Sequence, residues 1–374
     1  MTHLRILHTN NLLQWGGQSR RILLLCHEQQ RMGHQVLLAA PAASVLARRA
    51  AEAGIAVCDV TFPDGLAPRR MGREIARLTE LCRAERFDVI DAHCTRDIWM
   101  SALAARRARV PARVIRSRHN LFPVKPHLFN RYMHRTMVSW LIANCQAIAE
   151  IFVRGGLVPR ERISVIPSAV DLRECDASRD PGAVRRQLGI PGDALVIAVA
   201  ARISVEKGHR DLLEAAPLVR REHPRAVFLL LGAGPLEEEI REEAQRRGVA
   251  DAVVFAGFRE DVCNALGASD LVALPSHAEG TPAALLEAQA LRRPVVATRV
   301  GGIPDIVREG ETALLVEARD PSALAAAISG LLADPARRRA MGEAGRALVE
   351  AEFTVERMAA KTLAAYQSAL GAAR

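Results

Sequence analysis

The sequence predicts an α/β protein built from two doubly wound parallel sheets. Short apolar runs of strand length alternate with helical stretches along the chain, the pattern of strand–helix–strand units in a parallel sheet. The alternation stops over a polar stretch containing Pro and Gly at residues 168–193 and then restarts. With 374 residues, 49% of them hydrophobic, the chain can bury two cores of ordinary domain size. We therefore expect one domain at residues 1–170 and a second at 171–353.

In the first half, a strand at 4–8 leads into a loop that ends in Gly16 and Gly17. Ser19 is expected to cap the following helix, which should run to about Met32. Further strands are expected at 35–40, 88–92, 114–118, 140–144 and 163–167, and helices at 44–53 and 69–86. Glycines at a strand-to-helix turn let the backbone approach a phosphate closely. His93 and His119 each follow a strand directly, at the sheet edge where ligands bind.

In the second half, strands are expected at 195–200, 226–231, 253–256, 271–275, 294–298 and 313–316, followed by a helical tail. Arg202 and Lys207 lie on either side of the turn after the first of these strands, and Gly208 opens the next helix. An arginine fork and a lysine point charge placed in this way can clamp a diphosphate. Two exposed basic residues with no ligand are the alternative.

The crossing from the strand at 271–275 to the helix at 283–291 predicts an anion-binding turn. Thr281 is expected as the helix N-cap and Pro282 as the first helical residue, which leaves free backbone amides at the positive end of the helix dipole. Glu279 precedes this helix and Glu287 lies more than a turn inside it. Carboxylates accept hydrogen bonds from hydroxyls, so the turn suits a ligand with both phosphate and sugar. A surface helix with two ordinary acidic residues is the alternative.

The net charge of +9 is concentrated in the first half, where residues 1–175 hold 26 Lys and Arg against 14 Asp and Glu. This half should meet an acidic partner, either a phosphorylated substrate or an anionic membrane face. Residues 106–135 are rich in arginine and include Phe122, Phe129 and Tyr132. This segment could rest on anionic lipid headgroups or grip a phosphorylated acceptor, and a solvated helical face is the alternative.

The cysteines and the apolar runs bear on the compartment. The seven cysteines are scattered and form no C-x-x-C pair, so we expect buried free thiols rather than disulfides or zinc ligands. No apolar run is long enough to span a bilayer, and the first residues do not resemble a signal peptide. We expect a cytoplasmic protein, with peripheral contact at the inner face of the membrane through the basic segment.

Several motifs together carry a resemblance to a known family. They are Arg202 with Lys207, Gly232-Ala233-Gly234-Pro235, Gly257-Phe258-Arg259, Glu279 with Glu287, and the run from Pro294 to Pro304. With them, the sequence resembles glycosyltransferase family 4, retaining enzymes of the GT-B fold in which two Rossmann-like domains face a central cleft. The Gly16-Gly17 loop, Gly33 to Val36 and residues 163–171 match weaker family motifs. One position departs from the family. The family often has glycine at the end of the helix that contains Glu287, whereas this chain has Arg292 there.

The resemblance implies that the second domain binds a nucleotide-sugar donor. Arg202 and Lys207 would neutralise the diphosphate, Glu287 would bond the ribose and Glu279 the donor sugar. Further substrate contacts are implied for Gly16, Gly17, Gly257, Phe258, Gly280, Thr281 and Ala283. His119 matches a family histidine near the transferred sugar, so the implied catalytic set is His119, Arg202, Lys207 and Glu279. The first domain would bind the acceptor, with a C-terminal helix at about 354–374 completing it.

We therefore expect a retaining transferase that moves a hexose from a nucleotide diphosphate sugar to an anionic or lipid-linked acceptor, in lipopolysaccharide or exopolysaccharide synthesis. UDP-sugars are favoured over GDP- or ADP-sugars as donors. The enzyme should stabilise the diphosphate leaving group, and with no D-x-D cluster in the sequence we expect no metal and no cofactor. A sugar-nucleotide epimerase, a phosphorylase and a basic nucleic-acid-binding protein are the alternatives. No nucleic acid is expected as a partner, because no known module is present and aromatic residues make up only 4% of the chain.

Overall fold

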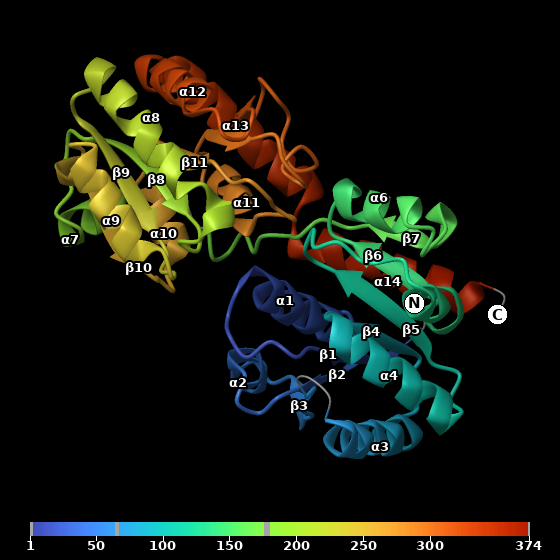
Figure 1. The fold of residues 1–374 in the computed structure, drawn as a ribbon. Helices are drawn as coiled ribbons and strands as arrows, with labels where there is room; N and C mark the ends of the chain where they lie inside the picture. Colours follow the sequence, from blue (N-terminus) through green and yellow to red (C-terminus); the bar gives the residue numbers. More distant parts are fainter. Residues whose placement is uncertain (1–2, 64–66, 176–179, 373–374) are drawn as a thin grey trace. The chain divides into compact units, whose positions relative to one another are not determined.

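The computed structural model describes residues 3–63, 67–175 and 180–372. The chain divides into two compact units (Figure 1), one of residues 1–168 with 355–374 and one of residues 169–354. These boundaries lie within two residues of the expected ones. Residues 176–179 of the expected junction and residues 373–374 of the expected C-terminal helix lie outside the described part.

The first unit contains a seven-stranded sheet in the order β3-β2-β1-β4-β5-β6-β7. All neighbouring strands run parallel. Its strands are β1 (Arg5–Thr9), β2 (Gln35–Ala40), β3 (Ala56–Asp59), β4 (Val89–Ala92), β5 (Arg113–Arg118), β6 (Trp140–Ala143) and β7 (Ile163–Val165). Central strands such as β4 are buried along their whole length, because helices cover both faces of a parallel sheet.

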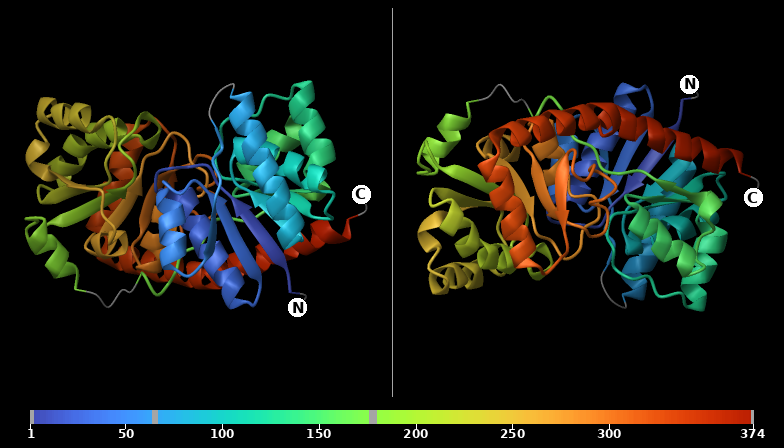
Figure 2. Two further views of the ribbon diagram at one scale, coloured as in Figure 1. Left: turned by 90° about the horizontal axis from the view of Figure 1, so that it is seen from below. Right: turned by 90° about the horizontal axis from the view of Figure 1, so that it is seen from above.

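The helices of this unit are α1 (Gly17–Arg31), α2 (Val45–Glu52), α3 (Pro68–Glu85), α4 (Thr95–Ala108), α5 (Leu128–Tyr132), a π-helical turn (Met133–Met137), α6 (Gln146–Arg154), a 3-10 turn (Arg160–Arg162) and α14 (Val355–Gly371). The last helix, α14, joins this unit although it ends the chain (Figure 2). It packs against α1, β5 and β6, and the buried Tyr366 hydroxyl donates a hydrogen bond to Asp91 Oδ2 at 2.6 Å. Strand β3 and helices α4 and α6 were not identified individually from the sequence.

The second unit contains a six-stranded sheet in the order β10-β9-β8-β11-β12-β13, again parallel throughout. Its strands are β8 (Leu195–Ala200), β9 (Ala226–Leu231), β10 (Val253–Gly257), β11 (Leu271–Leu274), β12 (Val295–Thr298) and β13 (Ala313–Val316). Its helices are α7 (Pro181–Gln187), a 3-10 turn (Val205–Lys207), α8 (His209–Glu222), α9 (Glu237–Arg246), a 3-10 turn (Ala250–Ala252), α10 (Val262–Gly267), α11 (Ala283–Ala290), α12 (Pro321–Ala333) and α13 (Pro335–Glu352).

Both sheets have the doubly wound order, in which the chain reverses its direction of growth beside the first strand. The reversal lies between β1 and β4 in the first unit and between β8 and β11 in the second. Loops leaving neighbouring strands part at this point, so ligands of such sheets bind beyond the carboxyl ends of these strands. The strand order therefore singles out the loops after β1, β4, β8 and β11.

Two expected helix starts are wrong. Helix α1 begins at Gly17 with Gly16 as its N-cap, and Ser19 lies inside the first turn, where its hydroxyl donates to the carbonyl of Gln14. Helix α11 begins at Ala283 with Pro282 as its N-cap, one residue later than Thr281 would require. In both places the N-cap residue has extended backbone and caps no amide with its side chain, because glycine and proline carry no polar side-chain group.

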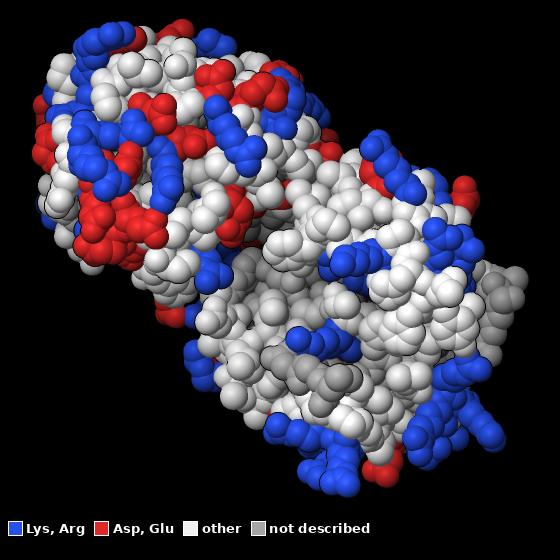
Figure 3. Space-filling model, viewed as in Figure 1, with Lys and Arg blue, Asp and Glu red and all other residues white. Residues whose placement is uncertain are grey.

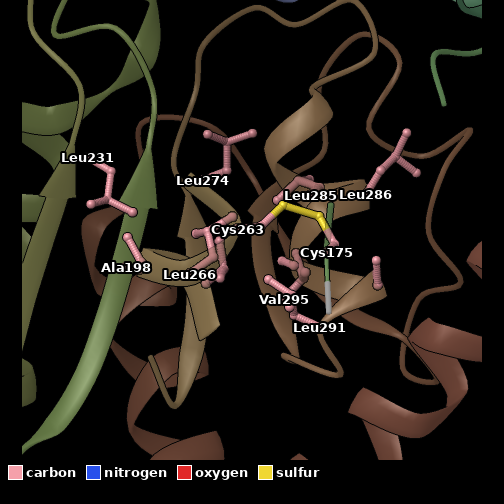
Figure 4. Packing of buried hydrophobic residues seen from close by; sticks show 14 of the residues in the cluster. Cys175, Ala198, Leu231, Cys263, Leu266, Leu274, Leu285, Leu286, Leu291 and Val295 are labelled. Atoms are coloured by element: carbon pink, nitrogen blue, oxygen red, sulfur yellow. A yellow bond between two sulfur atoms is a disulfide. The ribbon is translucent and has the colours of Figure 1, made fainter. Parts of the chain in front are cut away.

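The expectation of free thiols is wrong for two of the seven cysteines. Cys175 and Cys263 form a disulfide within the buried apolar cluster of the second unit (Figure 4), with their Cα atoms 5.2 Å apart. They are 88 residues apart in the sequence, so no local spacing could reveal the pair. Among the described residues, the other five cysteines form no disulfide.

The surface charge differs between the units on the face in view. Figure 3 shows acidic and basic side chains interleaved over the second unit and mostly basic ones over the first. Within the described ranges, no helix combines the length and hydropathy needed to cross a bilayer.

Candidate active site

The loops after β8 and β11 are held together by a backbone contact that only glycine permits. Gly208 has a φ of +66°, and a Cβ atom there would lie 1.9 Å from the carbonyl oxygen of Pro275. The same loops are tied by the amide of His277, which donates to the carbonyl of Glu206 at 2.8 Å. This contact places the turn that carries Lys207 against the loop that carries Glu279.

Lys207 and Glu279 form an ion pair, with 2.8 Å between Nζ and Oε1. The Ser276 hydroxyl donates to the same oxygen at 2.8 Å. The Glu279 side chain is 8% exposed and that of Lys207 is 21% exposed. Both described bonds go to Oε1, so the other oxygen, Oε2, remains available to accept from a ligand hydroxyl.

Arg202 lies on the other side of the same turn and is exposed. Both cations influence the carboxyl of Glu206. Burial raises the pKa of this carboxyl, but hydrogen bonds from the Ser204 hydroxyl and the backbone, together with the charges of Lys207 and Arg202, hold it below its usual value. Arg202 and Lys207 therefore act on one carboxylate from nearby positions. The structure thus brings together the two predicted cations and Glu279 beyond the carboxyl ends of β8 and β11.

The start of α11 faces the same loop. Its first amides have no partner inside the helix, as at every helix N-terminus, and Gly280 and Thr281 just before it are half-buried. Ala283 is the first helical residue. Glu287 lies one turn further on inside the helix, and both glutamates are buried.

The end of β10 supplies the remaining predicted residues of this unit. Gly257 has a φ of +64°, and its carbonyl accepts from the Gly232 amide at 2.8 Å, which ties the ends of β9 and β10. Phe258 is 62% exposed. Arg259 is held by two bonds to Asp261, each 2.8 Å long. An exposed aromatic ring can stack against a flat ligand.

In the first unit, the predicted glycines lie at the start of α1, and each is open to approach. A Cβ atom at Gly16 or Gly17 would meet nothing within 4 Å. The amides of this helix start are therefore accessible at the carboxyl edge of the sheet. Gln18 in the first turn donates to the His93 carbonyl at 3.2 Å and to Cys94 Sγ at 3.1 Å, which fixes the loop after β1 against the loop after β4.

His119 lies at the end of a hydrogen-bonded row that sequence reasoning missed. His93 Nδ1 lies 3.0 Å from His119 Nε2, His8 Nδ1 lies 2.9 Å from His93 Nε2, and His8 Nε2 lies 2.8 Å from Gln29 Oε1. Burial lowers the pKa of all three rings, that of His93 to about 3. The signal was present in the sequence, since each histidine ends or follows a strand, but only the order β1-β4-β5 makes these strands neighbours.

Among the described residues, His8, Asp91 and His93 are the one group of three whose ligand atoms lie close enough to share a metal ion. The ring nitrogens of His8 and His93 that face Asp91 are hydrogen-bonded to each other. Asp91 Oδ2 lies 4.0 Å and 3.9 Å from these two nitrogens and accepts from Tyr366. These contacts account for the arrangement as a buried polar network.

Comparison with known proteins identifies the family to which the chain belongs. A model described as glycosyltransferase family 4 matches residues 15–174, and one described as glycosyl transferases group 1 matches residues 182–348. A D-inositol 3-phosphate glycosyltransferase of Stackebrandtia nassauensis is 33% identical over 312 residues, which cover 76% of this chain and 69% of that protein.

Two further relatives are similar over shorter stretches. A D-inositol 3-phosphate glycosyltransferase of Segniliparus rotundus is 37% identical over 62% of this chain and 52% of its own. A GDP-mannose-dependent monoacylated alpha-(1-6)-phosphatidylinositol monomannoside mannosyltransferase of Corynebacterium glutamicum is 38% identical over 52% and 53%. The chain thus spans about half the length of these two relatives.

Solved structures share the fold at low identity. A glycosyltransferase from Rickettsia africae has a TM-score of 0.90 at 20% identity, with all of both chains covered. Anabaena HepE in complex with UDP has a TM-score of 0.83 at 22% identity, covering 96% of this chain and all of its own. The expected GT-B fold with two Rossmann-like units is confirmed. By its sequence matches and its fold, the chain belongs to glycosyltransferase family 4.

Proposed function

We propose that the protein is a retaining glycosyltransferase that moves a hexose from a nucleotide diphosphate sugar to an acceptor hydroxyl. The observation that carries the proposal is the Lys207–Glu279 pair beside the exposed Arg202. A cation for a phosphate and a carboxylate for a sugar thus lie in contact at the ligand-binding edge of a doubly wound sheet.

The chemistry follows from where negative charge develops. When the bond from the anomeric carbon to the phosphate oxygen breaks, charge accumulates on the diphosphate. Arg202, Lys207 and the first amides of α11 supply fixed positive groups for that charge, and such preorganised donors stabilise a transition state without reorganisation. Lys207 spends one of its three donors on Glu279, which leaves two for phosphate oxygens.

The two glutamates divide the remaining polar contacts. Glu279, which keeps one oxygen free, would accept from hydroxyls of the donor sugar, and the deeper Glu287 from those of the ribose. Phe258 would stack on the base. In the first unit, His119 and the amides at Gly16 and Gly17 would contact substrate at the carboxyl edge of that unit's own sheet.

A donor panel tests this assignment. Differential scanning fluorimetry and calorimetric titration with UDP, GDP, ADP and their sugars should give one nucleotide class that binds at micromolar concentration. We favour UDP-sugars, while the corynebacterial relative named above is GDP-mannose-dependent and HepE was solved with UDP. If no nucleotide binds, the proposed donor site is wrong. Incubation of the donor alone, with chromatography of the sugar, separates transfer from epimerisation.

For the acceptor we propose an anionic or lipid-linked glycan of the cell envelope, such as lipopolysaccharide or exopolysaccharide, reached at an anionic membrane surface. Near α5, the side chains of Leu128, Phe122, Phe129 and Tyr132 are 86%, 74%, 56% and 49% exposed. Phe129 stacks on Trp99 of α4 with 3.5 Å between ring centroids. Exposed apolar side chains within an arginine-rich segment are the composition that binds anionic lipid headgroups.

Vesicle flotation tests the membrane contact. The wild type should bind vesicles of phosphatidylglycerol and phosphatidylcholine but not phosphatidylcholine alone, and salt should weaken binding. The double variant Phe122→Ser, Leu128→Ser should lose binding about tenfold or more, because two exposed apolar groups no longer enter the headgroup layer. Leu218→Ser on α8 of the second unit is the matched control. If the wild type, the double variant and the control bind vesicles equally, the segment at 106–135 makes no membrane contact and is a solvated surface.

We further propose that turnover needs neither a metal nor a cofactor, because the cations of the second unit supply the leaving-group charge. Turnover should persist in excess EDTA. Loss of turnover on chelation, with recovery on adding Mg²⁺ or Mn²⁺, would contradict this part of the proposal and leave the donor assignment intact.

A further inference from the structure

Three imidazole rings and one amide in the first unit form a continuous chain of hydrogen bonds, which we call the histidine row: Gln29, His8, His93 and His119. His8 lies in β1, while His93 and His119 follow β4 and β5. These three strands are neighbours in the sheet. The row therefore crosses the carboxyl edge of the sheet and starts at α1, which carries Gln29.

The direction of the protons in this row follows from its buried end. A neutral imidazole carries one N–H, so each ring donates through one nitrogen and accepts through the other. Gln29 Oε1 can only accept, so His8 donates through Nε2 and accepts at Nδ1. His93 must then donate through Nε2 and accept at Nδ1. His119 in turn donates through Nε2, which leaves its Nδ1 as a bare lone pair.

The orientation of the Gln29 amide rests on its contact with His8, where Oε1 lies 2.8 Å from Nε2 of the ring. Nε2 of Gln29 has no hydrogen-bond partner among the described residues. Tyr366, on a neighbouring helix, donates its hydroxyl to Asp91 Oδ2 and is not a member of the row.

The row holds neutral rings and does not lead a proton away. Burial lowers the pKa of His8, His93 and His119; Asp91 opposes this for His8 and His93, while Arg21 reinforces it for His93 and His119. The far end is a buried amide, which neither gives up nor takes a proton near neutral pH. The row can therefore orient a ring, but it cannot act as a proton wire to water.

The open end of the row lacks a partner. His119 Nδ1 is buried without a hydrogen-bond partner among the described residues, and so is Oδ1 of the adjacent Asn120. A buried acceptor left unpaired is costly. His119 and Asn120 each have such an acceptor, and both follow β5 at the edge of the sheet where ligands bind. We infer a ligand that supplies hydrogen-bond donors to these two atoms. Hydroxyl groups supply such donors.

We propose that the histidine row positions His119, by holding its ring with Nε2–H inward and the Nδ1 lone pair outward, to accept a hydrogen bond from a hydroxyl of a substrate bound at the carboxyl edge of this sheet. The identity of this ligand rests on the proposed function. His8, His93 and Gln29 are positioning residues, since none of them has to touch the sugar.

The test begins with the wild type, because it needs no variant to fold. Long-range ¹H–¹⁵N NMR of ¹⁵N-histidine-labelled protein distinguishes a protonated from an unprotonated ring nitrogen, with assignment by the His119→Asn spectrum. The expected result is a protonated Nε2 and an unprotonated Nδ1 at His119. A protonated Nδ1, or a stoichiometric metal ion found by elemental analysis at His8 and His93, would overturn the proposal. This readout does not depend on turnover, so it stands apart from the proposed function.

Kinetics then tests whether the row acts through His119. His93→Leu should raise the KM for the substrate that binds His119 about 3- to 10-fold, the value of one hydrogen bond, with a smaller effect on kcat. In the His119→Ala background the same change should have no further effect, and additive losses would overturn the proposal. Gln29→Leu is the second variant if His93→Leu fails to fold. His34→Leu is the control, because His34 is a buried histidine of the same unit that accepts from the Leu4 amide outside the row.

Discussion

Replacing Lys207 with methionine tests the ion pair at the centre of the proposed donor site. Methionine keeps the length and apolar stem of the side chain but removes its charge. In the second unit, Lys207 Nζ lies 2.8 Å from Glu279 Oε1, and Ser276 donates to the same oxygen. The variant therefore has two separable consequences, one for turnover and one for stability.

The magnitude for turnover follows from the role of the cation. A preorganised donor to developing charge contributes about 10²- to 10³-fold in kcat, and Arg202 and the α11 amides remain in Lys207→Met. We expect a loss of about 10²-fold, or roughly 2.7 kcal/mol of transition-state stabilisation. For stability, Glu279 is 8% exposed and keeps only the Ser276 bond. Leaving a nearly buried carboxylate short of a partner costs about 1–3 kcal/mol, less than for a fully buried pair because Lys207 is partly exposed.

The double variant Lys207→Met, Glu279→Gln separates the two effects. A neutral amide no longer needs a cation, so the free energy of unfolding should recover by most of the loss while turnover stays low. The assay pairs release of nucleoside diphosphate from the donor with urea unfolding. Arg210→Met is the control, because it breaks an exposed ion pair with Glu239 on α9. Turnover within threefold of wild type, or no recovery of stability in the double variant, would refute this account.

Three further predictions concern stability and its pH dependence. In urea unfolding, Gly208→Ala should lower the free energy of unfolding by at least about 2 kcal/mol more than Gly248→Ala. Both glycines have a φ of +66°, but only a Cβ at Gly208 would meet a backbone oxygen, at 1.9 Å. Equal losses of stability would contradict the close contact. Tyr366→Phe should cost about 1–3 kcal/mol, since buried Asp91 loses the donor to its Oδ2, and a thermal shift below about 1 °C would be against it. Burial lowers the pKa of His209 to about 4, so the unfolded chain takes up a proton below about pH 6.5 while the folded chain does not. Stability should therefore fall by about 3 kcal/mol between pH 6.5 and pH 4 on account of this ring, and His209→Gln should flatten that slope in unfolding curves recorded across the range.

Much of the fold could be predicted because its signals are local. The apolar runs of β8, β9 and β11 are continuous since both faces of a parallel sheet are buried. Arg292 stands where the family often has glycine, and its φ of +56° confirms a left-handed residue after α11. Strand β3 at the edge of the sheet was missed because its ends are exposed and its middle is only half-buried, so it carries no continuous apolar run.

The edge of the sheet on which the proposed donor residues of the second unit lie was predictable for a related reason. Arg202, Lys207 and Glu279 lie in loops that follow strands, and Glu287 lies in the helix after one of these loops. In a parallel sheet, the strands end at a shared edge. The residues that follow each strand can therefore be assigned to one edge of the sheet from the order of strands and helices alone. The contact between Lys207 and Glu279, however, depends on the close approach that Gly208 allows.

The sequence by itself determined where the strands end, which half of the chain is basic and where the motifs of the proposed donor site lie, because these are properties of short segments. The fold alone decided which distant segments touch. Cys175 meets Cys263, and His8, His93 and His119 join into one row because β4 inserts beside β1 and β5 beside β4. The physical reason is that pairing between strands is set by burial of the whole sheet, so contacts across it have no signature in local spacing.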